Sequence, residues 1–260
     1  MLTKPPGDID WQTWVQRWDR MQERYLVKRS ERFRTIVRLL QGSRDTVERV
    51  IDLGCGTGSL TRAVLNAFQQ AIVCGIDFDP TMLWLAEARL TRFGNRFKAV
   101  LADIRDPSWT SAIQQPVDAV VSATALHWFT ADQLERLYQQ IADVIRPGGV
   151  FLNADHVGSC SPRIQQAWER HRSEVCAKAA KPDSDDWYGF WREYSRALGL
   201  DVKETHQRVI GGWEGGVEEG LPLAWHLDKL RESGFVHVDC FWRCDCDAIY
   251  GGIRHDHNAD

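Results

Sequence analysis

The stretch VIDLGCGTGSL, Val50 to Leu60, joins an apolar, strand-like segment to a helical pattern through three alternating glycines. Glycine permits positive φ in a tight turn, and it lets a ligand approach the main chain where a Cβ would collide. A dinucleotide fingerprint would need its third glycine three residues after the second, where Ser59 stands. The spacing D-x-G-x-G-x-G instead predicts a ligand with a nucleoside and a zwitterionic tail, and places Asp52 near the cation of that tail.

Strand-like and helix-like segments alternate on both sides of this stretch. The strand-like segments are RVIDL (49–53), AIVCGID (71–77), FKAVLADI (97–104), VDAVVSAT (117–124) and GGVFLNADH (148–156). Helix starts are predicted at Asp79, as the N-cap before Pro80, and at Thr130, in a capping box with Gln133. The alternation predicts an α/β fold: a doubly wound, mostly parallel sheet that is covered on both faces.

Four segments are expected along the chain. Residues 1–45 form N-terminal cap helices, residues 46–157 form the core, and residues 158–225 form an inserted helical cap with a glycine-rich interruption, GGWEGG. Residues 226–254 return to the core with a helix, a strand, and DAIYGGI as a final antiparallel edge strand.

Ligands of such sheets bind at the carboxyl ends of the strands, which defines the candidate site residues. Asp77 ends the second strand about 20 residues beyond the glycine loop, the reach at which a carboxylate accepts bonds from both ribose hydroxyls. Asp103, at the end of the third strand, is expected to accept from the exocyclic amine of adenine. Phe78 and Met82 offer apolar contact to the ring. Ala123 is a candidate at the end of the fourth strand.

The motifs VIDLGCGTGSL, GIDFDPTML, LADI, VDAVVSATALHW and IRPGG together resemble those of the class I S-adenosylmethionine-dependent methyltransferases. The resemblance implies a seven-stranded sheet with a reversed last strand, and S-adenosylmethionine as the methyl donor. It places Gly54, Gly56 and Gly58 beside the methionine moiety, Asp77 at the ribose, and Asp103 with Ile104 at the adenine. The motifs YLVKRSER and ALHW resemble those of the trans-aconitate methyltransferase branch. This resemblance adds Tyr25 and Arg32, both in YLVKRSER, to the expected cofactor residues.

Two histidines are the candidate catalytic residues. His127 follows the fourth strand and His156 ends the fifth, so either imidazole can meet the acceptor and remove its proton. Alternatively they only shape the pocket, because placing two reactants in line already lowers a barrier by about 7 kcal/mol or more. The tryptophans of the two cap segments either form an aromatic chamber for an apolar, aromatic or cationic small molecule or are ordinary cap packing.

Composition narrows the function class. A net charge of -4 argues against a nucleic-acid-binding protein, although nine basic residues between Arg17 and Arg44 keep an RNA-modifying enzyme open as an alternative. A non-catalytic S-adenosylmethionine-binding module is the other alternative.

The sequence also bears on location and metal binding. No apolar run is long enough for a membrane span, and the seven scattered cysteines fit reduced thiols in the cytoplasm. No metal site is expected: Cys240, Cys244 and Cys246 share one parity in an extended strand, so they do not converge. The acceptor atom and the oligomeric state stay open.

Overall fold

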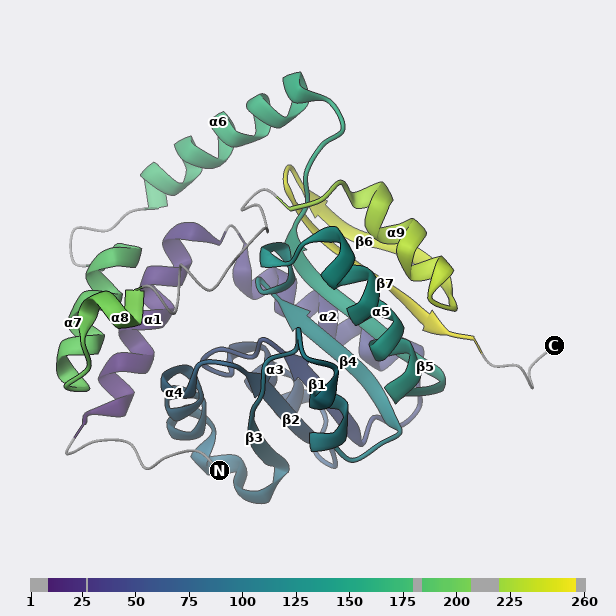
Figure 1. Ribbon diagram of the computed structural model, residues 1–260, viewed down its shortest axis with the longest axis horizontal. Coiled ribbons are helices and arrows are strands. Elements are labelled where there is room, and N and C mark those ends of the chain that lie inside the picture. Colours follow the sequence, from purple (N-terminus) through teal and green to yellow (C-terminus); the bar gives the residue numbers. More distant parts are fainter. Residues whose placement is uncertain (1–8, 27, 180–183, 207–219, 256–260) are drawn as a thin grey trace.

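The computed structural model describes residues 9–26, 28–179, 184–206 and 220–255 and has a seven-stranded sheet in the order β3-β2-β1-β4-β5-β7-β6 (Figure 1). The strands are β1 (Arg49–Leu53), β2 (Ile72–Asp77), β3 (Phe97–Leu101), β4 (Val117–Ala123), β5 (Ile145–His156), β6 (Phe235–Cys244) and β7 (Asp247–Arg254). β1 to β5 pair in parallel, and β7 runs antiparallel to both neighbours. The predicted doubly wound sheet with one reversed strand is confirmed.

Nine α-helices and three 3-10 helices lie in the described residues. The α-helices are α1 (Trp11–Tyr25), α2 (Arg29–Ser43), α3 (Ser59–Ala67), α4 (Pro80–Leu90), α5 (Ala131–Val144), α6 (Pro162–Ala179), α7 (Trp187–Ala197), α8 (Val202–His206) and α9 (Leu223–Glu232). The 3-10 helices are η1 (Thr91–Arg96), η2 (Pro107–Ala112) and η3 (Leu126–Trp128). None of the described helices is long and apolar enough to cross a membrane.

Both faces of the sheet are buried, as the continuous apolar strands predict. Along β1, Val50 packs into a cluster with side chains of α2 and α3, whereas Ile51 and Leu53 pack into a second cluster with side chains of α5. Successive side chains of a strand point to opposite faces, so one apolar run supplies both clusters. Figure 1 shows α5 in front of the sheet and α2 behind it.

The predicted helix starts are confirmed at atomic level. The Asp79 carboxylate accepts from the Thr81 amide at 2.8 Å, and Pro80 occupies the first position of α4. Thr130 and Gln133 form both bonds of a capping box at the start of α5. These caps accept hydrogen bonds from amides that have no partner inside the helix, so each helix begins at the residue that its local sequence predicts.

The N-terminal helix and the insertion pack together into one aromatic layer. Trp14 of α1 contacts Phe190 and Tyr194 of α7 at ring-centroid distances of 5.8 and 5.1 Å, and this cluster also includes Met82 and Trp84 of α4. The layer lies beside the sheet, at the left of Figure 1, whereas α6 extends above it and has no buried residues. Two segments far apart in the sequence therefore make one cap.

Two expectations about the C-terminal half need revision. DAIYGGI is not an edge strand: β7 lies between β5 and β6, and a Cβ at Gly251 would lie 1.9 Å from the Phe151 carbonyl oxygen. Trp225 belongs to α9 and packs with Tyr138 of the core rather than with the cap. GGWEGG lies outside the described residues.

The shared-parity argument for the three cysteines is also wrong. The pairing of β6 with β7 shifts register between Cys240 and Trp242, and Cys246 lies beyond the end of β6. An irregular strand does not keep a strict two-residue alternation. Across the described residues, no group of three or more His, Cys, Asp or Glu side chains is arranged to hold a metal ion.

Candidate active site

A cavity of about 740 Å³ opens at the carboxyl ends of β1, β2, β4 and β5, where the strand rule placed the site. Its floor is made by the loops that follow the strands, and its roof by α1, α6 and α7. The lining residues come from eight separate segments of the chain. The lining includes ten of the fourteen predicted site residues: Tyr25, Gly54, Gly56, Asp77, Phe78, Met82, Asp103, Ile104, His127 and His156.

The glycine loop has the backbone that its sequence predicts. Gly54, Gly56 and Gly58 have φ values of +62°, +52° and +73°, a region that favours glycine. A Cβ at Gly54 would lie 2.5 Å from the Ala125 side chain, and one at Gly58 would lie 2.7 Å from Leu90, so these two glycines allow close packing. A Cβ at Gly56 would meet nothing within 4 Å. Gly56 is thus the glycine that leaves room for a ligand.

Main-chain amides fix the carboxylate of Asp77 at the end of β2. Its Oδ2 accepts from Gly56 N at 2.8 Å and its Oδ1 accepts from Asp79 N at 2.9 Å. A carboxylate has about four acceptor sites, so capacity remains for two ribose hydroxyls. Burial raises the pKa of Asp77 to about 7, because the charged carboxylate loses its contact with water.

The expected adenine end of the cavity is built by the loop after β3. Asp103 accepts from the Arg105 main-chain amide at 2.9 Å and from its guanidinium at 2.7 Å. Arg105 also lies 6.0 Å from the centroid of the Phe78 ring. Phe78 and Met82 line the same cavity, which fits an apolar heterocycle between them and a polar edge beside Asp103.

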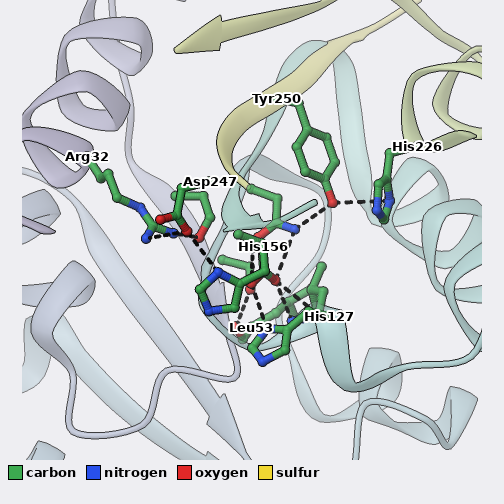
Figure 2. A network of polar contacts seen from close by, with 12 residues as sticks. Arg32, Leu53, His127, His156, His226, Asp247 and Tyr250 are labelled. Atoms are coloured by element: carbon green, nitrogen blue, oxygen red, sulfur yellow. Dashed lines mark hydrogen bonds and ion pairs between the residues drawn. The ribbon is translucent and has the colours of Figure 1, made fainter. Parts of the chain in front are cut away.

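Two histidines that line the cavity, His127 and His156, each pair with an aspartate behind them; Figure 2 labels both histidines. His127 Nδ1 lies 2.7 Å from Asp155 Oδ1, and His156 Nδ1 lies 2.8 Å from Asp247 Oδ1. The two imidazole rings meet edge to face at a centroid distance of 4.7 Å. In both pairs Nδ1 is bonded to the carboxylate, so Nε2 is the ring nitrogen that remains for other contacts.

The two pairs differ in charge. Asp155 also accepts main-chain bonds from Leu126, His127 and His156 at 2.8, 3.1 and 2.9 Å. Burial alone would raise its pKa, but the His127 imidazole and these amides hold the pKa of Asp155 well below its usual range. Asp247 instead pairs with the buried guanidinium of Arg32 at 3.2 Å.

His156 is held uncharged. Burial lowers the pKa of His156 below its ordinary value, although its bond to Asp247 acts in the opposite direction. Its Nε2 lies 3.4 Å from the Arg172 guanidinium of α6, which donates to a neutral ring nitrogen.

Four predicted cofactor residues do not line the cavity. Asp52 is buried under the glycine loop, where it accepts from the Thr61 hydroxyl at 2.6 Å, so its carboxylate is turned away from the expected ligand tail. Gly58 packs against α4, and Ala123 is still inside β4, one residue before the lining begins at Thr124. Arg32 is 1% exposed and donates to Asp247 and to the Ala154 carbonyl oxygen, which fixes α2 to the sheet.

The roof of the cavity is aromatic. Trp18 of α1 lies 5.9 Å from Trp187 and 6.1 Å from Trp191 of α7, measured between ring centroids, and all three line the cavity. Trp128 and Tyr188 add further rings to the lining. Other tryptophans of these segments, such as Trp14, pack inside the cap and do not line the cavity.

The rule of carboxyl strand ends covers Asp155, at the end of the fifth strand, but sequence reasoning missed Asp247 and Arg172 as members of the site. Asp155 carries a recognisable signal, because it stands beside His156 at a strand end. Asp247 and Arg172 come from β7 and α6, and nothing in their local sequence connects them to His156.

Comparison with known proteins agrees with this geometry. The methyltransferase domain family matches residues 50–149. A trans-aconitate 2-methyltransferase of Azoarcus sp. (strain BH72) is 32% identical over 242 residues, which cover 90% of both chains. The chain belongs to the class I S-adenosylmethionine-dependent methyltransferases, in the branch that includes the trans-aconitate 2-methyltransferases, and S-adenosylmethionine is the cofactor of this family.

Other matches are shorter or concern the fold alone. A trans-aconitate 2-methyltransferase of Streptomyces avermitilis is 36% identical over 143 residues, which cover 53% of this chain and 50% of that protein. Alignments to a yeast methyltransferase and to a malonyl-[acyl-carrier protein] O-methyltransferase of Hahella chejuensis cover 37% and 40% of those proteins. The chain thus spans half or less of the length of these three relatives. Human N-acetylserotonin methyltransferase shares the fold at a TM-score of 0.55 and 14% identity, over 95% of this chain and 57% of that one.

Proposed function

We propose that this protein transfers the methyl group of S-adenosylmethionine to a small molecule by in-line displacement. The observation that carries the proposal is that Gly56, Asp77 and Asp103 line one cavity together with His127 and His156. S-adenosylmethionine supplies a methyl group made electrophilic by its sulfonium. The chain's own residues bind the nucleoside, place the acceptor in line with the methyl carbon and exclude water.

The acceptor, in this proposal, has an apolar or aromatic part. Trp18, Trp187 and Trp191 line the cavity, and aromatic rings in a cavity wall favour apolar surface or another ring. The exposed basic face that an RNA substrate needs is weak, because Arg17, Arg29 and Arg32 are committed to ion pairs within the protein. We also propose that the protein works in the cytoplasm, since its seven cysteines are free thiols.

Two measurements test the function. Isothermal titration with S-adenosylmethionine should give a one-site binding curve, and Asp77→Ala should weaken the binding by about 1–3 kcal/mol because a buried acceptor is lost. Incubation with tritiated-methyl S-adenosylmethionine and a metabolite extract should then place label in a small molecule. Absence of binding would refute the proposal, and binding without transfer to any extract fraction would identify a non-catalytic module.

A further inference from the structure

The two aspartate–histidine pairs are close together but are not equivalent. Asp155 and Asp247 each bind one imidazole Nδ1, yet Asp247 also faces the Arg32 guanidinium at 3.2 Å and, through His156, the Arg172 guanidinium. Among the residues that the structure describes, no arginine side chain bonds to Asp155. The negative charge of Asp155 is therefore available to an imidazolium at His127, whereas that of Asp247 is already balanced.

The surroundings of His127 favour a neutral tautomer with Nε2 free to accept a proton. Three main-chain amides donate to the Asp155 carboxylate, and the Asn153 amide nitrogen lies 3.5 Å from it. Because these contacts fix the carboxylate, it accepts the Nδ1 proton of His127 in a fixed orientation of the imidazole ring. Asn153 in turn donates to Tyr250 at 2.8 Å. A buried carboxylate that orients an imidazole and stabilises its charged form is the arrangement of a general base.

The titratable groups around this pair come from every neighbouring element. They are Tyr138 on α5, His156 on β5, Asp247 and Tyr250 on β7, Arg32 on α2, Arg172 on α6 and His226 on α9. Burial lowers the pKa of His226 to about 4 and raises that of Tyr250, so both are uncharged at neutral pH. With Arg32 and Asp247 paired, His127 is the group placed to take a proton next to the cavity.

A general base identifies the acceptor, because only some acceptors need one. A carboxylic acid, with a pKa of about 4, has already lost its proton at neutral pH, whereas a phenol, with a pKa of about 10, has not. An amine is mostly protonated at neutral pH, and the Arg172 charge beside His156 disfavours a second cation there. The same charge favours an oxygen that becomes negative as its proton leaves.

We propose that the acceptor is an aromatic hydroxyl compound of the phenol class, whose proton His127 removes while Asp155 positions the imidazole; this inference depends on the proposed function. In the step, the hydroxyl proton moves to His127 Nε2. The new O–CH₃ bond forms as the S–CH₃ bond breaks, and the electron pair of the broken bond stays on sulfur as S-adenosylhomocysteine. The ring of the acceptor packs against the Trp18, Trp187 and Trp191 wall.

The chemical stability of the labelled product reveals the acceptor class, whichever compound carries the label. The protein is incubated with tritiated-methyl S-adenosylmethionine and a metabolite extract of its own cells, and the product is treated with mild alkali. We expect the label to stay bound, because an aryl methyl ether resists alkali, and mass analysis to locate the methyl group on oxygen. Release of labelled methanol, the mark of a methyl ester, overturns the inference, and so does a methylamine. Absence of any transfer refutes the proposed function instead.

A second experiment needs neither cofactor nor acceptor. Nitrogen-15 NMR of histidine side chains in the ligand-free protein should show the proton of neutral His127 on Nδ1, and Asp155→Asn should abolish this fixed tautomer. An unchanged His127 tautomer in a folded Asp155→Asn protein overturns the positioning role.

Kinetics of matched variants separates the two pairs. We expect Asp155→Asn to lower kcat about 10²- to 10⁴-fold, with little change in the KM of the acceptor. Asp247→Asn, the same change in the other pair, should lower kcat by less than about tenfold. Equal losses in the two variants would contradict the division between them, provided that both keep the wild-type unfolding midpoint.

Discussion

Replacing Gly56 of the glycine loop by alanine, with Gly94 as a control, distinguishes the cost of backbone strain from the loss of space for the cofactor. Gly56 has φ +52° and a Cβ there would meet no protein atom within 4 Å, and Gly94 in η1 has φ +55° and equally open surroundings. Only Gly56 lines the cavity. In the left-handed region alanine costs about 1–2 kcal/mol more than glycine, and the stiffer unfolded chain offsets a few tenths to about 1 kcal/mol of this. Gly56→Ala should therefore lower the unfolding free energy by about 1 kcal/mol. Gly94 has a ψ of −131°, in a region nearly restricted to glycine, so Gly94→Ala should lower the unfolding free energy by more, about 1–3 kcal/mol.

Their affinities for S-adenosylmethionine should differ. The new methyl group at position 56 occupies ligand space, so we expect the Kd of Gly56→Ala to rise at least about tenfold, equivalent to about 1.4 kcal/mol, while Gly94→Ala keeps the wild-type Kd. Urea unfolding gives the stability of each variant, and isothermal titration gives its Kd. If Gly56→Ala bound as tightly as Gly94→Ala, the glycine loop would not contact the cofactor.

Three further outcomes are expected. Burial raises the pKa of Asp77 in the folded protein to about 7, from an ordinary value of 3.8, so its contribution to stability is present below pH 3.8 and is lost as the pH rises through 7. The unfolding free energy of the ligand-free protein, measured by urea titration, should therefore fall as the pH rises from 3.8 through 7. Asp77→Asn should make this fall smaller. Arg32→Met should destabilise the fold by about 3–5 kcal/mol by leaving Asp247 buried without its guanidinium, whereas Arg17→Met, in a more exposed pair, should cost less than about 1 kcal/mol by the same unfolding assay. Tyr188→Ala at the cavity mouth, where the side chain is 61% exposed, should raise the acceptor KM in steady-state assays while the unfolding free energy changes by less than about 0.5 kcal/mol.

The local features of this protein were predictable because their causes lie within a few residues. A positive-φ loop needs glycine, a helix start needs an acceptor such as Asp79 or Thr130, and a strand buried on both faces needs an uninterrupted apolar run. Asp77 was placed correctly in the cavity for the same reason, since a strand end and its loop are adjacent in sequence. The doubly wound, mostly parallel sheet was also predicted, whereas DAIYGGI, expected at the edge, lies between β5 and β6 as β7.

The pairing of the polar side chains depends on the folded chain as a whole. Arg32 and Asp247 are separated by 215 positions, and His127 and Asp155 by 28, so no periodicity connects them. A buried charge is stable only where packing places an opposite charge or a hydrogen-bond partner beside it. Arg32 was expected to contact the ligand, but it pairs with Asp247 and connects α2 to β7. The order of amino acids was enough to predict the sheet, the glycine loop and the helix starts, because each depends on neighbouring residues. The division of two histidines into differently charged environments depends on side chains that only the folded core brings together.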